Sequence, residues 1–306
     1  MRAAAAGVLA DHLVGEPPLD PHPVALFGRA MRGVERRLYA DSRRAGVGHA
    51  VAGVALGTAA GAALGAADAA VTAGGNVASA LPTAAATYLA VAGRALRDAA
   101  ADVRGPLEAG DLVTARHRLR ALAGRDASGL DAKELARAVV ESLAENTVDA
   151  VVAPALWAAA LGAPGALAYR AVNTLDAMVG HRSARYARYG WASARLDDAA
   201  NWIPARVTAA LVGLVRPRRA NAVWATVRHQ AGSHPSPNAG VAEAAFAAAL
   251  GLRLGGTNRY GDRLELRPHL GDGRPAEPGD IGPAAVLSRD VTLALAALLA
   301  VGGSRR

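Results

Sequence analysis

The stretch "AVAGVALGTAAGAALGAA", from Ala50 to Ala67, contains no charged residue. At about 18 residues it is close to the length that a helix needs to cross the hydrocarbon core of a bilayer. Alanine and glycine favour membrane insertion only weakly, so composition alone leaves a buried helix of a soluble bundle open as an alternative. The distribution of charge around the stretch decides between the two.

Arginines flank this stretch in an alternating pattern. The segment Arg29 to Arg44 is basic, the link around Asp68 has no Lys or Arg, and Arg94 to Arg137 is basic again. A two-helix hairpin with both ends in the cytoplasm predicts this alternation, because cytoplasmic flanks of membrane helices are enriched in Lys and Arg. The sequence therefore predicts an all-α, polytopic integral membrane protein.

Other apolar segments extend the prediction along the chain. The approximate ranges are 1–14, 50–67, 69–93, 148–168, 203–215 and 283–303. "GAPG" at Gly162 to Gly165 interrupts the fourth range, which predicts a re-entrant or broken pair of half-helices. The region 216–280 is polar and punctuated by Gly and Pro, and is predicted as a cytoplasmic loop region. We expect a single domain over 1–306, and no internal repeat is apparent.

Composition limits the possible functions. The 306 residues carry a formal net charge of +8, almost all of it from Arg, and include no cysteine. Without cysteine the chain has no disulfide, no zinc–thiolate site and no thiol nucleophile. The positive charge suits anionic lipid headgroups or a phosphorylated substrate. Nucleic acid is not expected as a partner, because only 4% of the residues are aromatic and could stack on bases.

Three sets of an asparagine with carboxylates lie at helical spacing beside apolar segments. They are Asn146 with Asp149 in "ENTVDAVVAP", Asn173 with Asp176 in "NTLDAMVGHR", and Asp197, Asp198 and Asn201 in "RLDDAANWIPAR". Mg²⁺ is usually held by one or two carboxylates while phosphate oxygens supply other ligands. Each set could instead cap a helix, since Asn and Asp are good N-caps. Three sets together favour a shared polar cavity.

A fourth motif, "HQAGSHPSPNAGVAEAAF", places two prolines before an alanine-rich helix. Backbone amides at a helix start bind anions, so Ser233, Ser236 and Asn238 are candidates for holding a phosphate or carboxylate. An ordinary N-cap is the alternative. The glycine-rich stretch around Asn258 and Arg259 follows, and it matches neither a Walker loop nor a dinucleotide-binding fingerprint.

Several of these motifs, taken in order, resemble the CobD/CbiB family, the adenosylcobinamide-phosphate synthases of cobalamin biosynthesis. The matching stretches are "DHLVGEPP", "HPVALFGR", "ENTVDAVVAP", "YRAVNTLDAMVGHR", "ARLDDAANWIPARVTA", "SHPSPNAG" and "GGTNRYGD". The resemblance covers nearly the whole chain, and its middle and C-terminal motifs are long and specific.

The resemblance implies a multi-pass protein of the cytoplasmic membrane whose active site faces the cytoplasm. It would join aminopropanol, or its O-phosphate, to a propionate carboxyl of adenosylcobyric acid, with ATP consumed and an amide formed. The expected ligands are therefore this corrinoid, the amine, ATP with Mg²⁺, and membrane lipid. Other membrane enzymes of the late cobalamin pathway are candidate protein partners.

The resemblance and the acid pattern together suggest roles for the candidate residues. Metal ligands are expected at Asp197, Asp198 and Asn201, with Asp149 or Asp176. Substrate contacts are expected from Asn146, Asn173, Ser233, Ser236, Asn238 and Asn258. The catalytic candidates are Arg206 and Arg259, which would contact phosphates, and His234, which would take a proton from the attacking ammonium.

Two other classes of function remain open from the sequence. A Mg²⁺-dependent intramembrane transferase acting on an isoprenoid diphosphate would also use Asn and Asp on helices that face a cavity, but it leaves "SHPSPNAG" without a role. A non-catalytic membrane subunit or small transporter would use the polar sets to line a permeation path. The charges lie at helix edges rather than within crossing segments, which favours an enzyme.

Overall fold

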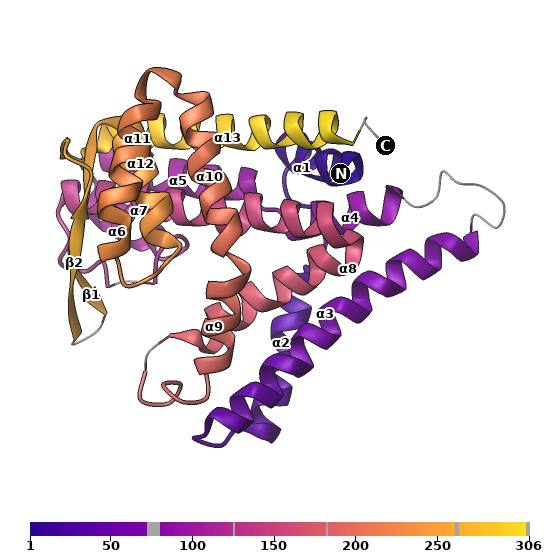
Figure 1. Ribbon diagram of the computed structural model, residues 1–306. Coiled ribbons are helices and arrows are strands. Elements are labelled where there is room, and N and C mark those ends of the chain that lie inside the picture. The colour runs from indigo at the N-terminus through magenta and orange to yellow at the C-terminus, as the bar shows by residue number, and fades with distance from the viewer. Residues whose placement is uncertain (72–79, 125, 182, 261–262, 304–306) are drawn as a thin grey trace. The chain divides into compact units, whose positions relative to one another are not determined.

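The computed structural model describes residues 1–306 except 72–79, 125, 182, 261–262 and 304–306, and it is largely helical (Figure 1). The chain forms two compact units, each built from discontinuous segments. Unit 1 comprises Met1–Ala92, Ala153–Asn201 and Ala296–Arg306, and unit 2 comprises Gly93–Val152 and Trp202–Leu295. The apolar pattern, which predicts one domain, does not indicate this division.

Unit 1 is built from seven named helical elements and the end of an eighth. They are α1 (Arg2–Val14), α2 (Pro23–Leu38), α3 (Arg43–Val71), α4 (Ala80–Ala90), α8 (Ala153–Leu175), the π-helical turn η2 (Asp176–Gly180), α9 (Trp191–Ala200) and the last turns of α13 (Ile281–Gly302). Its most extensive packing is between α3 and α8, which lie side by side in Figure 1.

Small residues allow α3 to approach α8 closely. Gly53, Gly57 and Gly61 recur every fourth residue and therefore share one face of α3. A Cβ atom added at Gly57 would lie 2.7 Å from the carbonyl oxygen of Leu167, and one at Gly61 would lie 2.5 Å from that of Ala163. This spacing of small residues is the one that membrane helices use for close packing.

We expect Gly57→Ala to destabilise unit 1, because the added methyl group meets backbone atoms of α8 that cannot move without shifting that helix. Overpacking of this kind costs about 1–3 kcal/mol. Gly65→Ala, on the same helix, is the control, since a Cβ there would meet no atom within 4 Å. Thermal unfolding in detergent should show a lower midpoint for Gly57→Ala only; equal midpoints would contradict the packing described here.

Helix α8 is broken within its span. Gly162 has φ +68°, outside the helical region, and Pro164 follows two residues later. A left-handed φ favours glycine, and proline lacks the backbone N–H that would continue the helical hydrogen bonds. The prediction of a broken pair of half-helices at "GAPG" is therefore confirmed.

Unit 2 contains the remaining helices and a small sheet. The helices are α5 (Gly93–Glu108), α6 (Leu112–Leu119), α7 (Ala132–Thr147), the π-helical turn η1 (Val148–Val152), α10 (Trp202–Val215), the 3₁₀ turn η3 (Pro217–Arg219), α11 (Ala220–Gln230), the 3₁₀ turn η4 (Ala231–Ser233), α12 (Ala239–Leu250), the 3₁₀ turn η5 (Pro278–Asp280) and most of α13. The strands are β1 (Leu252–Tyr260), β2 (Arg263–Leu270) and β3 (Arg274–Pro275).

The region 216–280, predicted as polar loops, is mostly regular structure. Helix α12 is buried from Ala239 to Ala249, and β1 continues the same core through Leu252 and Leu254. The sheet order is β2-β1-β3, with β1 antiparallel to β2 and parallel to β3. The prediction of polar loops is wrong for most of this region, because its many Gly and Pro residues separate short helices and strands.

Three described helical segments are long and apolar enough to cross a membrane: Arg43–Ala67, Ala132–Gly180 and Pro278–Gly302. They include the predicted ranges 50–67 and 148–168 and most of 283–303. The range 203–215 corresponds to α10, which is apolar but shorter, and 1–14 corresponds to α1. Part of 69–93 lies outside the described residues. The architecture is that of an all-α membrane protein with one small sheet.

Candidate active site

Unit 1 brings three of the predicted polar residues together at the end of α9. The Asp197 carboxylate accepts a hydrogen bond from Asn201 Nδ2 at 3.0 Å through Oδ2 and one from Asn173 Nδ2 at 3.4 Å through Oδ1. Asn173 lies on α8, so this contact joins α8 to α9. The structure therefore unites residues from two of the motifs found in the sequence.

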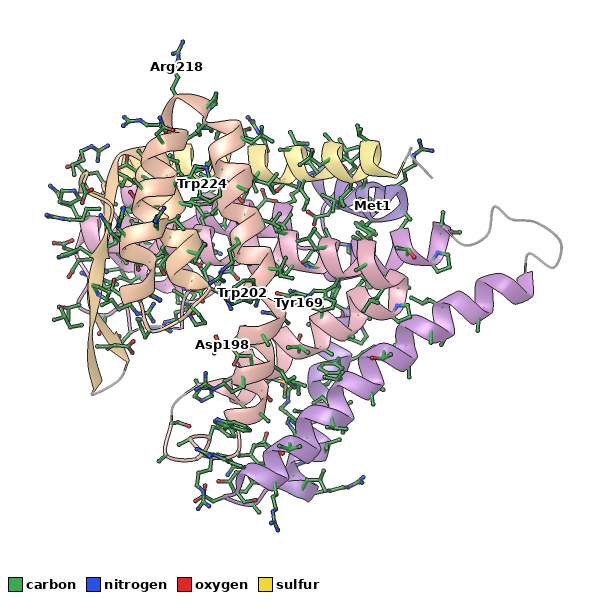
Figure 2. All side chains as sticks on the ribbon, viewed as in Figure 1. Met1, Tyr169, Asp198, Trp202, Arg218 and Trp224 are labelled. Carbon is green, nitrogen blue, oxygen red and sulfur yellow. The ribbon has the colours of Figure 1, made fainter. Side chains whose placement is uncertain are left out.

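Two aromatic residues of α8 fix this cluster in place. Tyr169, labelled in Figure 2, is 2% exposed and donates to Asn201 Oδ1 at 2.8 Å. Trp157 Nε1 donates to the carbonyl oxygen of Ala200 at 3.1 Å, which satisfies one open carbonyl at the C-terminus of α9. The sequence prediction, which rests on acids and amides, includes neither Trp157 nor Tyr169. Their signal in the sequence is an aromatic residue with a polar atom inside an apolar helix.

The neighbouring acids occupy different settings. Asp198 has a side chain that is 34% exposed, and its Oδ2 lies 3.9 Å from Arg195 Nη1. Asp176 begins the π-helical turn η2 in unit 1. Asp149 lies in the π-helical turn η1 of unit 2, where Asn146 Nδ2 donates to the carbonyl oxygen of Ser142 at 2.9 Å.

Both π-helical turns occur in similar heptapeptides. Residues 146–152 read NTVDAVV and residues 173–179 read NTLDAMV. The chain therefore contains a short internal repeat, although none was predicted. In each copy the threonine hydroxyl donates to the carbonyl four residues earlier, Thr147 at 2.6 Å and Thr174 at 2.7 Å. Single π turns within α-helices are frequent at functional sites, which strengthens both aspartates as candidates.

The acids of α9 are the candidate metal ligands in unit 1. Among the described residues, no three His, Asp or Glu side chains are grouped closely enough to hold an ion. Mg²⁺ needs only one or two carboxylates when phosphate oxygens and water complete its shell. Asp197 and Asp198 on α9 provide that number of carboxylates.

In unit 2, the predicted anion-binding loop is held by its own side chains. Ser236 Oγ accepts from the backbone N–H groups of Asn238 at 3.3 Å and Ala239 at 3.2 Å. Ser233 Oγ donates to the carbonyl oxygen of Gln230 at 2.6 Å. Ser236 therefore serves as the local cap of α12, and an anion at this helix start would have to replace its hydroxyl.

Arg206 and Asn238 meet, although they are 32 residues apart in the chain. Arg206 Nη1 donates to Asn238 Oδ1 at 3.0 Å and to the carbonyl oxygen of Trp202 at 2.8 Å. The guanidinium also lies 4.3 Å from the centre of the Trp202 ring, which is half-exposed. Its Nη2 donates to the carbonyl oxygen of Pro237 at 3.3 Å, so the guanidinium is held by the loop before α12 and by the Trp202 ring.

His234 is buried, with both ring nitrogens close to polar atoms. Arg267 Nη1 lies 3.1 Å from His234 Nε2, and both the backbone N–H and the carbonyl oxygen of Ser236 lie close to Nδ1, at 3.1 and 3.2 Å. Burial lowers the pKa of His234, and the positive charge of Arg267 lowers it further. The ring is therefore neutral at pH 7 and holds the loop, which favours positioning over proton abstraction.

Glu243 completes this cluster, and the sequence analysis missed it. Its side chain is 1% exposed on the otherwise apolar α12, and Oε1 lies 3.8 Å from His234 Nε2 and 3.9 Å from Arg267 Nη1. A buried carboxylate requires a nearby positive charge. The signal in the sequence is one glutamate in a run of alanines directly after "SHPSPNAG".

A second buried glutamate anchors the β-hairpin nearby. Glu141 of α7 accepts from the backbone N–H of Gly255 at 2.9 Å and from Arg137 Nη1 at 3.2 Å. Gly255 and Gly256 have φ angles of +87° and +103° at a bulge in β1, a conformation that favours glycine. Asn258 and Arg259 follow in β1, but their side chains lie outside the described residues.

The lowered pKa of His234 predicts a dependence of stability on pH. The unfolded chain binds a proton at this ring near its ordinary pKa of 6.5, while the folded chain does not. The free energy of unfolding should therefore fall as the pH drops below about 6.5, by at most about 1.4 kcal/mol per pH unit for this group.

Thermal unfolding between about pH 7.5 and about pH 5.5 measures this effect. We expect His234→Asn to lose part of the wild-type decline in midpoint, because its amide does not titrate. His229→Asn is the control, since His229 is exposed. A decline of unchanged size in His234→Asn would show that His234 does not titrate in this way.

Most of the chain matches one known protein family. A family model described as CobD/Cbib protein matches residues 4–288. The chain belongs to the CobD/CbiB family. A "Cobalamin biosynthesis protein CobD" of Mycobacterium tuberculosis (strain CDC 1551 / Oshkosh) is 48% identical over 301 residues, which cover 96% of this chain and 93% of that relative.

More distant members of the CobD/CbiB family carry the same name. The protein of Geobacter metallireducens is 43% identical over 279 residues, covering 89% of this chain and 86% of its own. The protein of Halalkalibacterium halodurans is 38% identical over 310 residues, covering 98% and 96%. No solved structure matches the chain. The family match includes every candidate residue named above.

Proposed function

We propose that this chain acts in cobalamin biosynthesis as an ATP-dependent ligase. It would join aminopropanol, or its O-phosphate, to a propionate carboxyl of adenosylcobyric acid. The observation that carries the proposal is the match to the CobD/CbiB family over residues 4–288, together with relatives named cobalamin biosynthesis proteins. The polar clusters in both units supply the residue types that this chemistry requires.

The reaction must first turn a carboxylate into an acylating group. An oxygen of the propionate attacks the γ-phosphorus of ATP, ADP leaves, and an acyl phosphate forms. The amine nitrogen then attacks the acyl carbon, phosphate leaves, and the nitrogen loses a proton to give the amide. Most of the protein's contribution to such steps is positioning and charge stabilisation.

In unit 1, we assign the nucleotide's metal to the end of α9. Asp197 and Asp198 would hold Mg²⁺, which when bound offsets the charge of the phosphates. Asn173 and Asn201 orient the Asp197 carboxylate through their hydrogen bonds, and Tyr169 in turn holds the Asn201 amide. Within unit 1, Asp176 remains a candidate for a further ligand, while Asp149 of unit 2 stays a prediction from the sequence.

In unit 2, we assign phosphate contacts to Arg206, with Arg259 as a second candidate. Asn238 and the Trp202 ring hold the Arg206 guanidinium in one orientation. His234 enters the proposal as a positioning residue of the loop, because its ring nitrogens are engaged by Arg267 and Ser236.

The proposal places the protein in the cytoplasmic membrane with its active site facing the cytoplasm, where ATP is available. Cysteines introduced singly at Ser183 and Ser233 into this cysteine-free chain should then resist an impermeant thiol reagent in intact cells. Both should react after permeabilisation, which shows that the sites are accessible. Labelling of either site from outside would exclude this topology.

The reaction itself is tested with purified protein in detergent. ATP consumption should require both adenosylcobyric acid and the amine, and mass spectrometry should detect the amide product. Running the assay with aminopropanol and with its phosphate decides which amine is used. Transfer from an isoprenoid diphosphate without ATP would support the prenyl transferase alternative, and absence of turnover with all substrates present would favour a non-catalytic membrane subunit.

A further inference from the structure

An apolar pocket opens in unit 1 beside α2. It has a volume of about 300 Å³ and is bounded by α2, α3, α4 and α8. Representative lining residues are Phe27 from α2, Leu56 and Ala60 from α3, Leu89 from α4 and Leu167 from α8. The α3 and α8 residues belong to candidate membrane spans. Arg170 and Thr174 of α8 also line the pocket, and the remaining lining is apolar, so the pocket suits a hydrocarbon chain.

Helix α2 has two chemically different faces. Pro23, Phe27 and Ala30 follow the spacing of one helical face and line the pocket. Arg29, Arg32 and Arg36 follow the spacing of another face and are all exposed. A helix with one apolar face and one arginine-rich face is typical of segments that lie in the membrane interface.

The exposed charge on α2 is entirely positive. Its one acid, Glu35, is buried and accepts hydrogen bonds from Arg185 Nη2 at 3.0 Å and from the Tyr186 hydroxyl at 2.9 Å. Its charge is therefore directed toward the loop that carries Arg185, away from the exposed arginines. A surface with this charge attracts acidic headgroups more strongly than zwitterionic ones.

We propose that α2 lies in the membrane interface and that the pocket beside it holds one acyl chain of an acidic phospholipid. The phosphate of that lipid lies against the exposed arginines of α2. The lipid is a bound structural partner and not a substrate, and the proposal does not depend on the ligase reaction.

The experiment uses full-length protein in detergent micelles and phosphatidylglycerol with a photoactivatable diazirine in one acyl chain. After irradiation, mass spectrometry should find the label on residues 23–30, 56–60 or 167–174. The matching phosphatidylcholine probe should label these residues at least about fivefold less, because it lacks the net negative charge. Equal labelling by both probes, or labelling spread over all the apolar helices, would overturn the proposal.

Two sets of variants distinguish the contribution of the pocket to lipid labelling from the contribution of the arginines on α2. Ala30→Trp, or Ala60→Phe if the first does not fold, narrows the pocket and should remove its labelling. Replacing Arg29, Arg32 and Arg36 by Gln should remove the preference for phosphatidylglycerol while labelling of the pocket remains. The matched control replaces the exposed Arg218, Arg219 and Arg228 of unit 2 by Gln, which removes the same charge.

The control triple variant should keep the preference for phosphatidylglycerol. If it loses the preference as well, net charge explains the result and the proposal fails. Exclusion of the probe by a stable dimer, detected by size-exclusion chromatography with light scattering, would assign the pocket to a second copy of the chain and would also overturn the proposal.

Discussion

Asp197→Asn should reduce amide synthesis by roughly 100-fold while the protein still folds and inserts into the membrane. The substitution keeps the shape of the side chain and removes one negative charge from the proposed Mg²⁺ site. Added Mg²⁺ should restore part of the activity, because a site with fewer charged ligands binds the ion more weakly. The measurement is turnover of purified protein at limiting and at excess Mg²⁺, with ATP held constant.

The surroundings of Asp197 predict a second, smaller effect. Both carboxylate oxygens accept amide N–H groups, from Asn201 and Asn173, and the new side chain can accept at one oxygen only. Both hydrogen bonds are partly buried, and losing one of them costs about 1 kcal/mol. The thermal midpoint of Asp197→Asn should therefore fall, although folding is retained.

Asp198→Asn separates charge from hydrogen bonding. The Asp198 side chain is 34% exposed, and its amide replacement keeps the same shape, so this variant should lose activity at limiting Mg²⁺ with a smaller change in thermal midpoint than Asp197→Asn. Asp98→Asn is the matched control, because Asp98 is an exposed acid of α5 with a 71% exposed side chain. Normal turnover of Asp197→Asn and Asp198→Asn at limiting Mg²⁺ would exclude the metal role.

Arg267→Met should destabilise unit 2 by about 3–5 kcal/mol, because it removes a positive charge that lies 3.9 Å from the buried Glu243 carboxylate. His234 cannot compensate at neutral pH, since its pKa is lowered by burial. Amide synthesis should fall together with stability, because the His234 ring that contacts Ser236 before α12 loses its contact with Arg267. Thermal unfolding and turnover of the same preparation measure both effects.

A double variant distinguishes packing from positioning. Glu243→Gln combined with Arg267→Met removes both charges, so most of the lost stability should return. Turnover should remain low, because His234 has lost the contact from Arg267 that helps to hold its ring in place. Full recovery of turnover along with stability would show that the cluster serves folding alone. Arg253→Met, which removes an exposed arginine of β1, controls for the loss of positive charge.

Local chemistry was enough to predict the helical membrane architecture and the break in α8. An uncharged run flanked by alternating basic segments indicates spans, because bilayer thickness and charge asymmetry act on sequence directly. "GAPG" indicates a break because glycine and proline act on their own backbone. The acid and amide motifs were visible for a similar reason, since charged and amide groups are rare beside apolar helices.

The partners of those residues depended on the tertiary structure. Nothing local joins Asn173 to Asp197, 24 residues later, or Arg206 to Asn238, because packing of separate helices creates these contacts. Tyr169, Glu141, Glu243 and Arg267 look ordinary in the sequence, and burial gives each its role.

Packing also decided the states of His234 and Ser236. The sequence predicts a base at His234, and burial beside Arg267 keeps that ring neutral. The sequence predicts an anion contact at Ser236, and the turn before α12 directs its hydroxyl to the backbone amides of Asn238 and Ala239. The sequence by itself therefore determined the membrane fold and the residue types available for chemistry. Only the tertiary structure decided which polar groups meet, because desolvation and hydrogen bonding between distant segments exist only once the chain is folded.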